Sequence, residues 1–165
     1  MTGAIDIYTK PLTPAGFAPF GDVLDVAGEA DKIINQGKCG RYHDRAQLDF
    51  GADGRAGISL FKSEVRTLPY EIEMMERHPD GTQAFLPMSM TAFLIVVASD
   101  QNGRPGVPEA FISAPGQGIN FHRNVWHGVL TPLHDPGLFA VVDRIGNTPN
   151  LEEFWFEPQY VVKNS

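Results

Sequence analysis

The hydrophobic residues of this chain fall in short runs that glycine and proline separate. The sequence contains 17 glycines and 13 prolines among its 165 residues. They interrupt the apolar runs about every ten residues, a spacing typical of β-sandwiches and β-barrels. Sustained helical periodicity is scarce, so the pattern predicts an all-β fold.

The apolar runs predict strands over residues 22–26, 33–35, 41–44, 57–61, 70–78, 83–87, 92–98, 110–113 and 138–144, with a further pair around 119–129. Residues 93–97 are all apolar, which predicts a central strand covered on both faces. Residues 100–106 are expected to form an exposed hairpin loop. One short N-terminal helix is predicted, because Thr13 is a capping residue and Pro14 suits the first helical position. Gly21 is expected to end this helix.

The segment 68–78 fits two kinds of element. As a helix it would begin near Pro69 and carry basic side chains in its last turn. As a strand, its apolar side chains alternate with glutamates, and its neighbours in the sequence are also predicted strands. We favour the strand. Because successive side chains on a strand alternate in direction, one face would then carry Tyr70, Ile72, Met74, Glu76 and His78.

The size and charge of the chain restrict its class. A length of 165 residues is typical of one domain, expected to span residues 1–165. The formal charge of −7 argues against nucleic acid as a partner, because phosphates would meet net repulsion. Cys39 is the only cysteine, so no intramolecular disulfide can form. The first residues lack a secretory pattern, and the longest apolar run is too short to cross a bilayer, so we expect a cytoplasmic protein without membrane association.

Polar groups with catalytic or metal-binding capacity follow the predicted strand 70–78. On a strand, the Cβ atoms of Glu76 and His78 would lie about 6.6 Å apart along one face. That separation suits two ligands of one metal, or an acid and a base on either side of a small substrate. Gln83 follows the Pro79–Gly81 turn and could return beside them. The alternative is a solvated strand end in which Glu76 pairs with a neighbouring arginine.

Two further histidines, His122 and His127, lie five residues apart. On one uninterrupted strand they would face opposite sides. A turn or bulge at Arg123-Asn124 would let them converge, and the two histidines together with Glu76 and His78 would then suggest a metal or acid–base site. The alternative places one histidine at a barrel rim and the other beside Trp126.

Other charged residues are candidates for binding a small acid. Arg41 could hold a carboxylate with two hydrogen bonds, and Tyr42 beside it could donate a proton, although an exposed edge strand would explain both. Lys62 follows an apolar segment and could reach a pocket. Asp143 and Arg144 close a predicted strand, where such a pair is more often structural.

Several catalytic signatures are missing from the sequence. It contains no nucleophile elbow of the Gly-x-Ser-x-Gly type, no Walker loop and no dinucleotide fingerprint. With one cysteine, no Cys-x-x-Cys pair is possible. Covalent serine or cysteine catalysis, a nucleotide or organic cofactor, and a structural zinc finger are therefore not expected.

Several blocks of the sequence resemble one known family. Residues 76–88 read Glu-Arg-His-Pro-Asp-Gly-Thr-Gln-Ala-Phe-Leu-Pro-Met, and residues 118–127 read Gly-Ile-Asn-Phe-His-Arg-Asn-Val-Trp-His. Both closely resemble ureidoglycolate lyases, also called ureidoglycolate hydrolases, of allantoin breakdown. The segments 17–23, 41–44 and 143–144 are also similar to that family, and the similarity extends from about residue 12 to at least 144.

This resemblance implies a cupin-type fold, a double-stranded β-helix or jelly-roll barrel, usually as a homodimer. It implies cleavage of (S)-ureidoglycolate to glyoxylate and urea, with a divalent metal, Ni²⁺, associated with the family. In the cupin pattern, Glu76 takes the place of a first histidine, His78 that of the second, and Gln83 that of the glutamate. The last histidine would be His122 or His127. We expect the metal set Glu76, His78 and His122.

The resemblance also implies roles for the candidate residues. The expected proton-transfer or metal groups are His78, His122, Glu76 and His127. The expected substrate-binding residues are Arg41, Lys62, Gln83, Asn120 and Tyr42, the first two for the carboxylate and Gln83 and Asn120 for the ureido group. Three alternatives stay open: hydrolysis of ureidoglycolate with release of ammonia, another cupin enzyme acting on a small acid, and a non-catalytic barrel that binds one.

Overall fold

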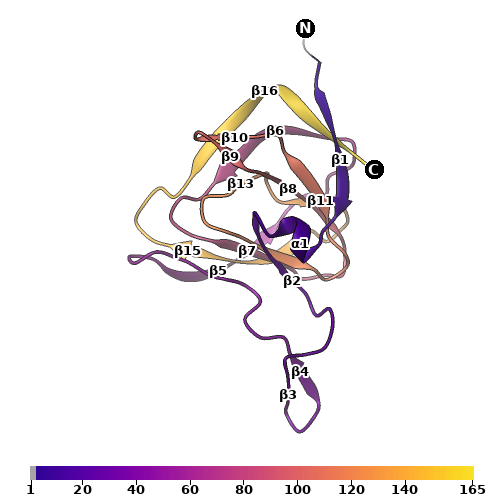
Figure 1. The fold of residues 1–165 in the computed structure, drawn as a ribbon, viewed down its shortest axis with the longest axis vertical. Helices are drawn as coiled ribbons and strands as arrows, with labels where there is room; N and C mark the ends of the chain where they lie inside the picture. The colour runs from indigo at the N-terminus through magenta and orange to yellow at the C-terminus, as the bar shows by residue number, and fades with distance from the viewer. Residues whose placement is uncertain (1–2) are drawn as a thin grey trace.

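A computed structural model describes residues 3–165 of the chain as a nearly all-β protein (Figure 1). Met1 and Thr2, part of the segment inspected for a targeting signal, lie outside the described residues. No helix within residues 3–165 is long and apolar enough to cross a membrane. Most strands belong to two sheets that face each other, so the cupin-type, jelly-roll barrel expected from the sequence is confirmed.

The larger sheet has seven strands in the order β11-β1-β16-β6-β13-β8-β14. Their bounds are β1 Ile5–Pro11, β6 Tyr70–Arg77, β8 Phe93–Ala98, β11 Glu109–Ile112, β13 Trp126–His127, β14 Thr131–Pro132 and β16 Glu152–Lys163. Because β11 also pairs with β8, six of these strands close into a ring.

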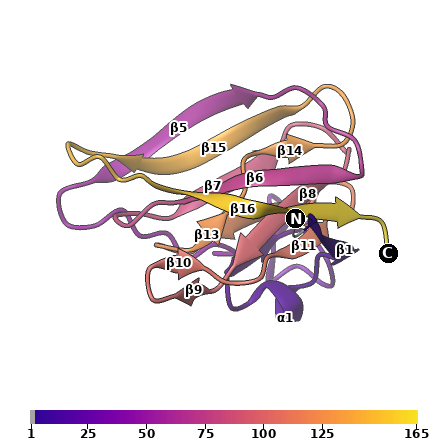
Figure 2. The same ribbon diagram turned by 90° about the horizontal axis from the view of Figure 1, so that it is seen from above.

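The smaller sheet has five strands in the order β2-β12-β7-β15-β5. Their bounds are β2 Gly21–Leu24, β5 Arg55–Lys62, β7 Gln83–Pro87, β12 Gly118–Phe121 and β15 Leu138–Ile145. The long strands β5 and β15 lie side by side (Figure 2) and pair over eight residue positions. The two remaining hairpins are β3 Lys32–Ile34 with β4 Cys39–Arg41, and β9 Asp100–Gln101 with β10 Arg104–Pro105.

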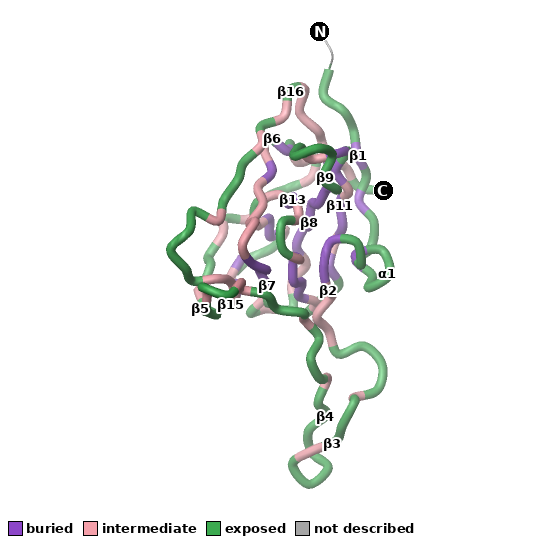
Figure 3. The backbone as a smooth tube through the Cα atoms, turned by 60° about the vertical axis from the view of Figure 1, so that its left-hand side comes forward, coloured by how far each residue is buried: buried purple, intermediate pink, exposed green. Residues whose placement is uncertain are grey.

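Two hydrophobic clusters hold these sheets together. One cluster lies inside the six-stranded ring and draws on all six strands, with Trp126 and Met75 among its buried residues. The other fills the space between the two sheets and beneath the N-terminal helix, and contains Phe85, Phe121 and Phe139. All six residues of β8 are buried, its side chains alternating between the two clusters. This confirms the prediction that 93–97 is a central strand (Figure 3).

The segment 70–77 is a strand, as favoured from the sequence, but its side chains do not keep a single alternation. Ile72 and Met75, three residues apart, both belong to the cluster inside the ring. Opposite them, the register of β16 shifts between Trp155 and Tyr160. This irregularity reverses which side the following residues face. The prediction that Tyr70, Ile72, Met74, Glu76 and His78 share one face is therefore wrong.

The N-terminal helix α1, Pro14–Phe17, begins as predicted. Thr13 caps it by accepting a hydrogen bond from the backbone N–H of Gly16 at 3.1 Å. The helix ends at Phe17, whose buried ring anchors it in the core, rather than at Gly21. Gly21 instead opens β2, where any Cβ would collide with the backbone oxygen of Asn120.

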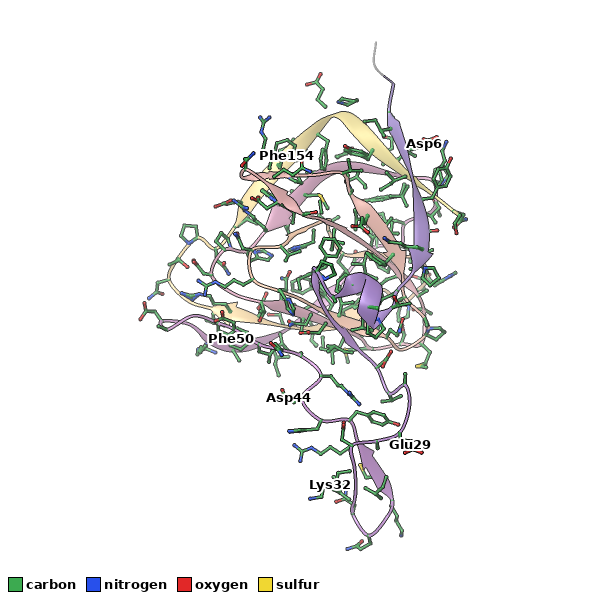
Figure 4. The ribbon with its side chains drawn as sticks, in the orientation of Figure 1. Asp6, Glu29, Lys32, Asp44, Phe50 and Phe154 are labelled. Atoms are coloured by element: carbon green, nitrogen blue, oxygen red, sulfur yellow. The ribbon has the colours of Figure 1, made fainter. Side chains whose placement is uncertain are left out.

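A hairpin built on β3 and β4 projects away from the barrel (Figure 1). We call residues 25–45 the arm. Most of its residues are exposed (Figure 3), and Figure 4 shows Glu29, Lys32 and Asp44 along it, well outside the two sheets. Two-stranded hairpins are marginal on their own, so the arm has little internal support.

Candidate active and metal site

Glu76, His78 and His127 form a compact cluster between the two sheets. Their ligand atoms all lie within 4.8 Å of one another. Glu76 and His127 face each other across the β6–β13 ladder, and His78 follows the end of β6. From the carboxylate oxygen Oε1 of Glu76, the distance is 3.8 Å to Nε2 of His78 and 3.6 Å to Nε2 of His127.

Backbone carbonyls fix the protonation of both imidazole rings. Nδ1 of His78 lies 2.8 Å from the backbone oxygen of Asn150, and Nδ1 of His127 lies 3.0 Å from that of Val125. A carbonyl oxygen only accepts hydrogen bonds, so each Nδ1 must carry the proton. In the neutral rings Nε2 is then a free lone pair, which is how metal-binding histidines are usually oriented.

The cluster therefore brings three acceptors together. Nε2 of each histidine is buried without a hydrogen-bond partner among residues 3–165, and both approach a carboxylate. Buried acceptors that face each other without a donor are costly. A positive charge between them, either a proton on Nε2 of His127 or a metal ion, relieves this repulsion. Two imidazoles and one carboxylate are a suitable donor set for a divalent transition metal, so the residues fit such an ion.

The surroundings favour the charge states that metal binding needs. The neighbouring imidazole of His127 lowers the pKa of Glu76, against the opposing effect of burial, so the carboxylate is ionised at neutral pH. Burial, and then the charge of His127, lower the pKa of His78. The ring of His127 is stacked on Phe121, with centroids 4.2 Å apart, which fixes the plane of the imidazole.

A cavity of about 480 Å³ opens beside the cluster. It is lined by residues from both sheets and the loops between them: Phe61, Lys62, Ser63, Arg66, Glu76, Gln83, Phe85, His127, Gly128, Val129 and Leu130. Two cations, Lys62 and Arg66, thus share one cavity with the carboxylate of Glu76. The guanidinium of Arg66 also lies 5.7 Å from the ring centroid of Tyr70, within the range of a cation–π contact.

Gln83 was expected at this site, and its side chain lines the cavity. It is 6% exposed, and its Nε2 donates a hydrogen bond to Oδ2 of Asp143 at 3.1 Å. Asp143 lies directly opposite Gln83 in the β7–β15 ladder. The carbonyl oxygen Oε1 of Gln83 is buried and has no hydrogen-bond partner within residues 3–165.

The structure separates His122 from the cluster: the predicted grouping of Glu76 and His78 with His122 is not found, and His127 lies beside them instead. The expected turn does occur: Asn124 has φ 66°, and its N–H bonds to the backbone oxygen of His78 at 2.9 Å. The turn lies after His122, and only His127 returns beside Glu76. His122 faces the outside of the smaller sheet, with Nε2 3.1 Å from Asp22.

Asn120 also points away from the cavity. On β12 its neighbours Ile119 and Phe121 face the core between the sheets, so the alternation turns Asn120 outward. It is fully buried there. Its Nδ2 donates hydrogen bonds to Asp22 at 3.0 Å and to the backbone oxygen of Gln47 at 3.1 Å. Asn120 therefore does not line this cavity, and its observed contacts hold the segment that follows the arm.

Arg41 and Tyr42 lie on the arm and do not line the cavity of their own chain. Arg41 is exposed, and the hydroxyl of Tyr42 donates a hydrogen bond to the backbone oxygen of Gly28 at 3.0 Å. Lys62 does reach the cavity. Sequence reasoning missed Arg66, which lies in a segment between strands without any pattern to mark it, and gave Asp143 a structural role.

Comparison with known proteins identifies the family of this chain. The family model described as ureidoglycolate lyase matches residues 4–163. A ureidoglycolate lyase of Rhodobacter capsulatus is 57% identical over 148 residues, covering 90% of this chain and 92% of that protein. One of Mesorhizobium japonicum is 51% identical over 157 residues, covering 94% and 96%. A protein of Rhizobium meliloti named ureidoglycolate lyase 2 is 48% identical over 160 residues, covering 96% and 98%. This chain belongs to the ureidoglycolate lyase family.

Proposed function

We propose that this protein cleaves (S)-ureidoglycolate to glyoxylate and urea, as a step of allantoin and purine degradation that makes nitrogen available. The observation that supports this most directly is the cavity lined by Glu76, His127 and two cations, with His78 beside Glu76 in the same cluster. Its size suits a small acid, and its groups match the charges and protons of the reaction. The comparisons with family members support the same activity.

The reaction moves protons and breaks one C–N bond. Ureidoglycolate carries a carboxylate, a hydroxyl and a ureido nitrogen on one carbon. A base takes the hydroxyl proton, the oxygen electron pair becomes the C=O bond of glyoxylate, and the C–N electron pair leaves with urea. An acid then delivers a proton to that nitrogen. Each well-positioned transfer contributes roughly 10²–10⁴-fold to the rate.

The residues of the cavity divide these tasks. Glu76 is the base, since it is ionised and faces the cavity. His127 lies beside Glu76, with Nε2 3.6 Å from its carboxylate, and is the candidate acid for the urea nitrogen. Lys62 and Arg66 hold the substrate carboxylate, because two cations that line one cavity suit an anion there. Gln83 binds the ureido group.

In a metal-bound form, with Ni²⁺ suggested by the resemblance to the family, Glu76, His78 and His127 would hold the ion in place of their proton-transfer roles. The ion would supply Lewis-acid chemistry, lowering the pKa of the substrate hydroxyl. His78 then serves as a ligand, held in orientation by Asn150. The buried, unpartnered Nε2 atoms of the two histidines support this assignment.

One assay decides between this function and its alternatives. Purified protein is incubated with racemic ureidoglycolate, with and without a chelator, and glyoxylate, urea and ammonia are quantified. We expect glyoxylate and urea in equal amounts from half of the substrate. Ammonia in place of urea would indicate hydrolysis instead, and binding without product would indicate a non-catalytic barrel.

We also propose that the protein is a cytoplasmic homodimer. The outer face of the smaller sheet carries Ile58, Leu60 and Leu86, exposed by 77%, 66% and 40%, and β5 is an edge strand. Exposed apolar patches of this kind favour association.

The arm has little support within its own chain, so contact with a second copy would stabilise it, and Arg41 could bind substrate only in a partner's cavity. Light scattering after gel filtration gives the mass, and a monomer would contradict the proposal.

A further inference from the structure

The side-chain amide of Gln83 has a fixed direction. The carboxylate of Asp143 only accepts hydrogen bonds, so the NH₂ group of Gln83 must face it, as the 3.1 Å contact shows. Oε1 of Gln83 is thereby turned to the other side. There it is buried, without a hydrogen-bond partner among residues 3–165, although the residue lines the cavity.

An acceptor left in this state indicates a missing donor. Leaving a buried carbonyl oxygen without a partner is energetically unfavourable, and only 6% of Gln83 is exposed. The cationic donors of the cavity, Lys62 and Arg66, lie on the segment 62–66 and suit the carboxylate of a ligand, while the hydroxyl of Ser63 donates to the backbone oxygen of Leu130. The ureido group of ureidoglycolate brings N–H donors of its own.

We infer that Asp143 is a positioning residue, which locks the amide of Gln83 so that Oε1 accepts a hydrogen bond from a ureido N–H. This inference rests on the proposed function and deepens it. This fixed orientation makes the cavity selective. An acid that carries a hydrogen-bond acceptor at the ureido position, such as a second carboxylate, would be repelled by Oε1 of Gln83 and would bind weakly. Asp143 exerts this effect through Gln83, without itself touching substrate.

The test compares three variants with wild type, each assayed with ureidoglycolate. Asp143→Asn allows both orientations of the Gln83 amide, because an asparagine can donate as well as accept. Gln83→Met removes the amide at similar volume. The double variant Gln83→Glu with Asp143→Asn restores the hydrogen bond between the two positions in the opposite direction. The introduced asparagine donates to one oxygen of the introduced glutamate, and the other oxygen faces the cavity as an acceptor. Asp53→Asn, an exposed loop change, is the matched control.

We expect KM to rise roughly 3- to 10-fold in each single variant, the range given by loss of one neutral hydrogen bond, while kcat changes little. The double variant should recover most of this loss. The inhibition constant of glyoxylate, which lacks the ureido group, should stay unchanged in all variants. A double variant as poor as the worse single variant, or a parallel loss of glyoxylate binding, would overturn the inference.

A second readout excludes a role of Gln83 as a metal ligand. Calorimetric titration with Ni²⁺ should give wild-type affinity in Gln83→Met, whereas a loss of tenfold or more would make Gln83 a ligand and overturn the inference. If wild-type protein forms no glyoxylate from ureidoglycolate, the proposed function fails instead. In that case the side-chain ¹⁵N–H signals of Gln83 still decide whether Asp143 holds the amide: slow hydrogen exchange in wild type and fast exchange in Asp143→Asn are expected, and equal rates would refute the lock.

Discussion

His127 stands directly opposite Glu76 across the β6–β13 ladder, with its Nε2 3.6 Å from the carboxylate. The two residues come from segments far apart in the sequence, yet one backbone pairing brings them together. His78 completes the cluster because its ring is held by Asn150 from a third segment. The pairing of β6 with β13 thus brings Glu76 and His127 together, and the segment between β15 and β16 orients His78 beside them.

Metal binding should stabilise the folded protein through this cluster. Ni²⁺ at about 100 times its dissociation constant adds about 2.7 kcal/mol to the free energy of unfolding, roughly 5–10 °C in melting temperature for a chain of this size. Calorimetric melting with and without the metal measures this shift. His127→Asn should abolish it, while His134→Asn, which changes an exposed histidine, should keep it. An equal shift in both variants would place the metal elsewhere.

Turnover should distinguish the two histidines of the segment 122–127. His127→Asn removes a group in contact with Glu76, and we expect kcat/KM to fall at least about 100-fold, the scale of one lost proton-transfer group. His122→Asn changes a residue on the outside of the smaller sheet, so kcat/KM should stay close to the wild-type value. Initial rates of glyoxylate formation give both values. Comparable losses in the two variants would contradict the placement of the site.

The two cations of the cavity should govern substrate affinity. Lys62→Met and Arg66→Met each remove a charged donor from the site of the carboxylate, and a hydrogen bond to a charged group contributes about 1.5–3 kcal/mol. We therefore expect kcat/KM to fall about 10- to 100-fold in each, mainly through KM. Lys10→Met, which removes a cation that pairs with Glu109 on another surface, is the control. A wild-type KM in both cavity variants would remove the carboxylate clamp from the proposal.

The sequence predicted most strands because their signals are local. The strand 83–87 was predicted to the residue, since a Pro-Asp-Gly turn precedes it and a buried apolar run defines it. The strands β1 and β16 were not predicted. Pro158 lies within β16, and a proline within a run argues against a strand. β1 is stabilised by parallel pairing with β11 and β16, which are distant in the sequence.

The candidate site was predictable only in part, for a related reason. The residue types and the turn at Arg123-Asn124 are visible in the sequence, but the spacing of His122 and His127 allowed either to converge on Glu76. The choice depends on which side of the smaller sheet β12 presents outward, and that is set by its pairing with β2 and β7. Such non-local pairing also hid the role of Asp143, which is defined by its position opposite Gln83.

The contacts of Asp22 predict an acid-dependent loss of stability. Burial alone would raise the pKa of this carboxyl, but hydrogen bonds from Asn120, from the backbone N–H of Gln47 and from His122 outweigh it and lower the pKa below 3.8. Because the pKa is lower in the folded than in the unfolded chain, Asp22 contributes stability above about pH 4 that is lost as the pH falls through the folded value.

Urea unfolding across this acidic range should show the decline in wild type. In Asp22→Asn the free energy of unfolding should be lower near neutral pH and decline less steeply toward acid. The control Asp53→Asn should follow wild type, and an Asp22→Asn curve parallel to wild type would show that Asn120 and His122 are held without this charge.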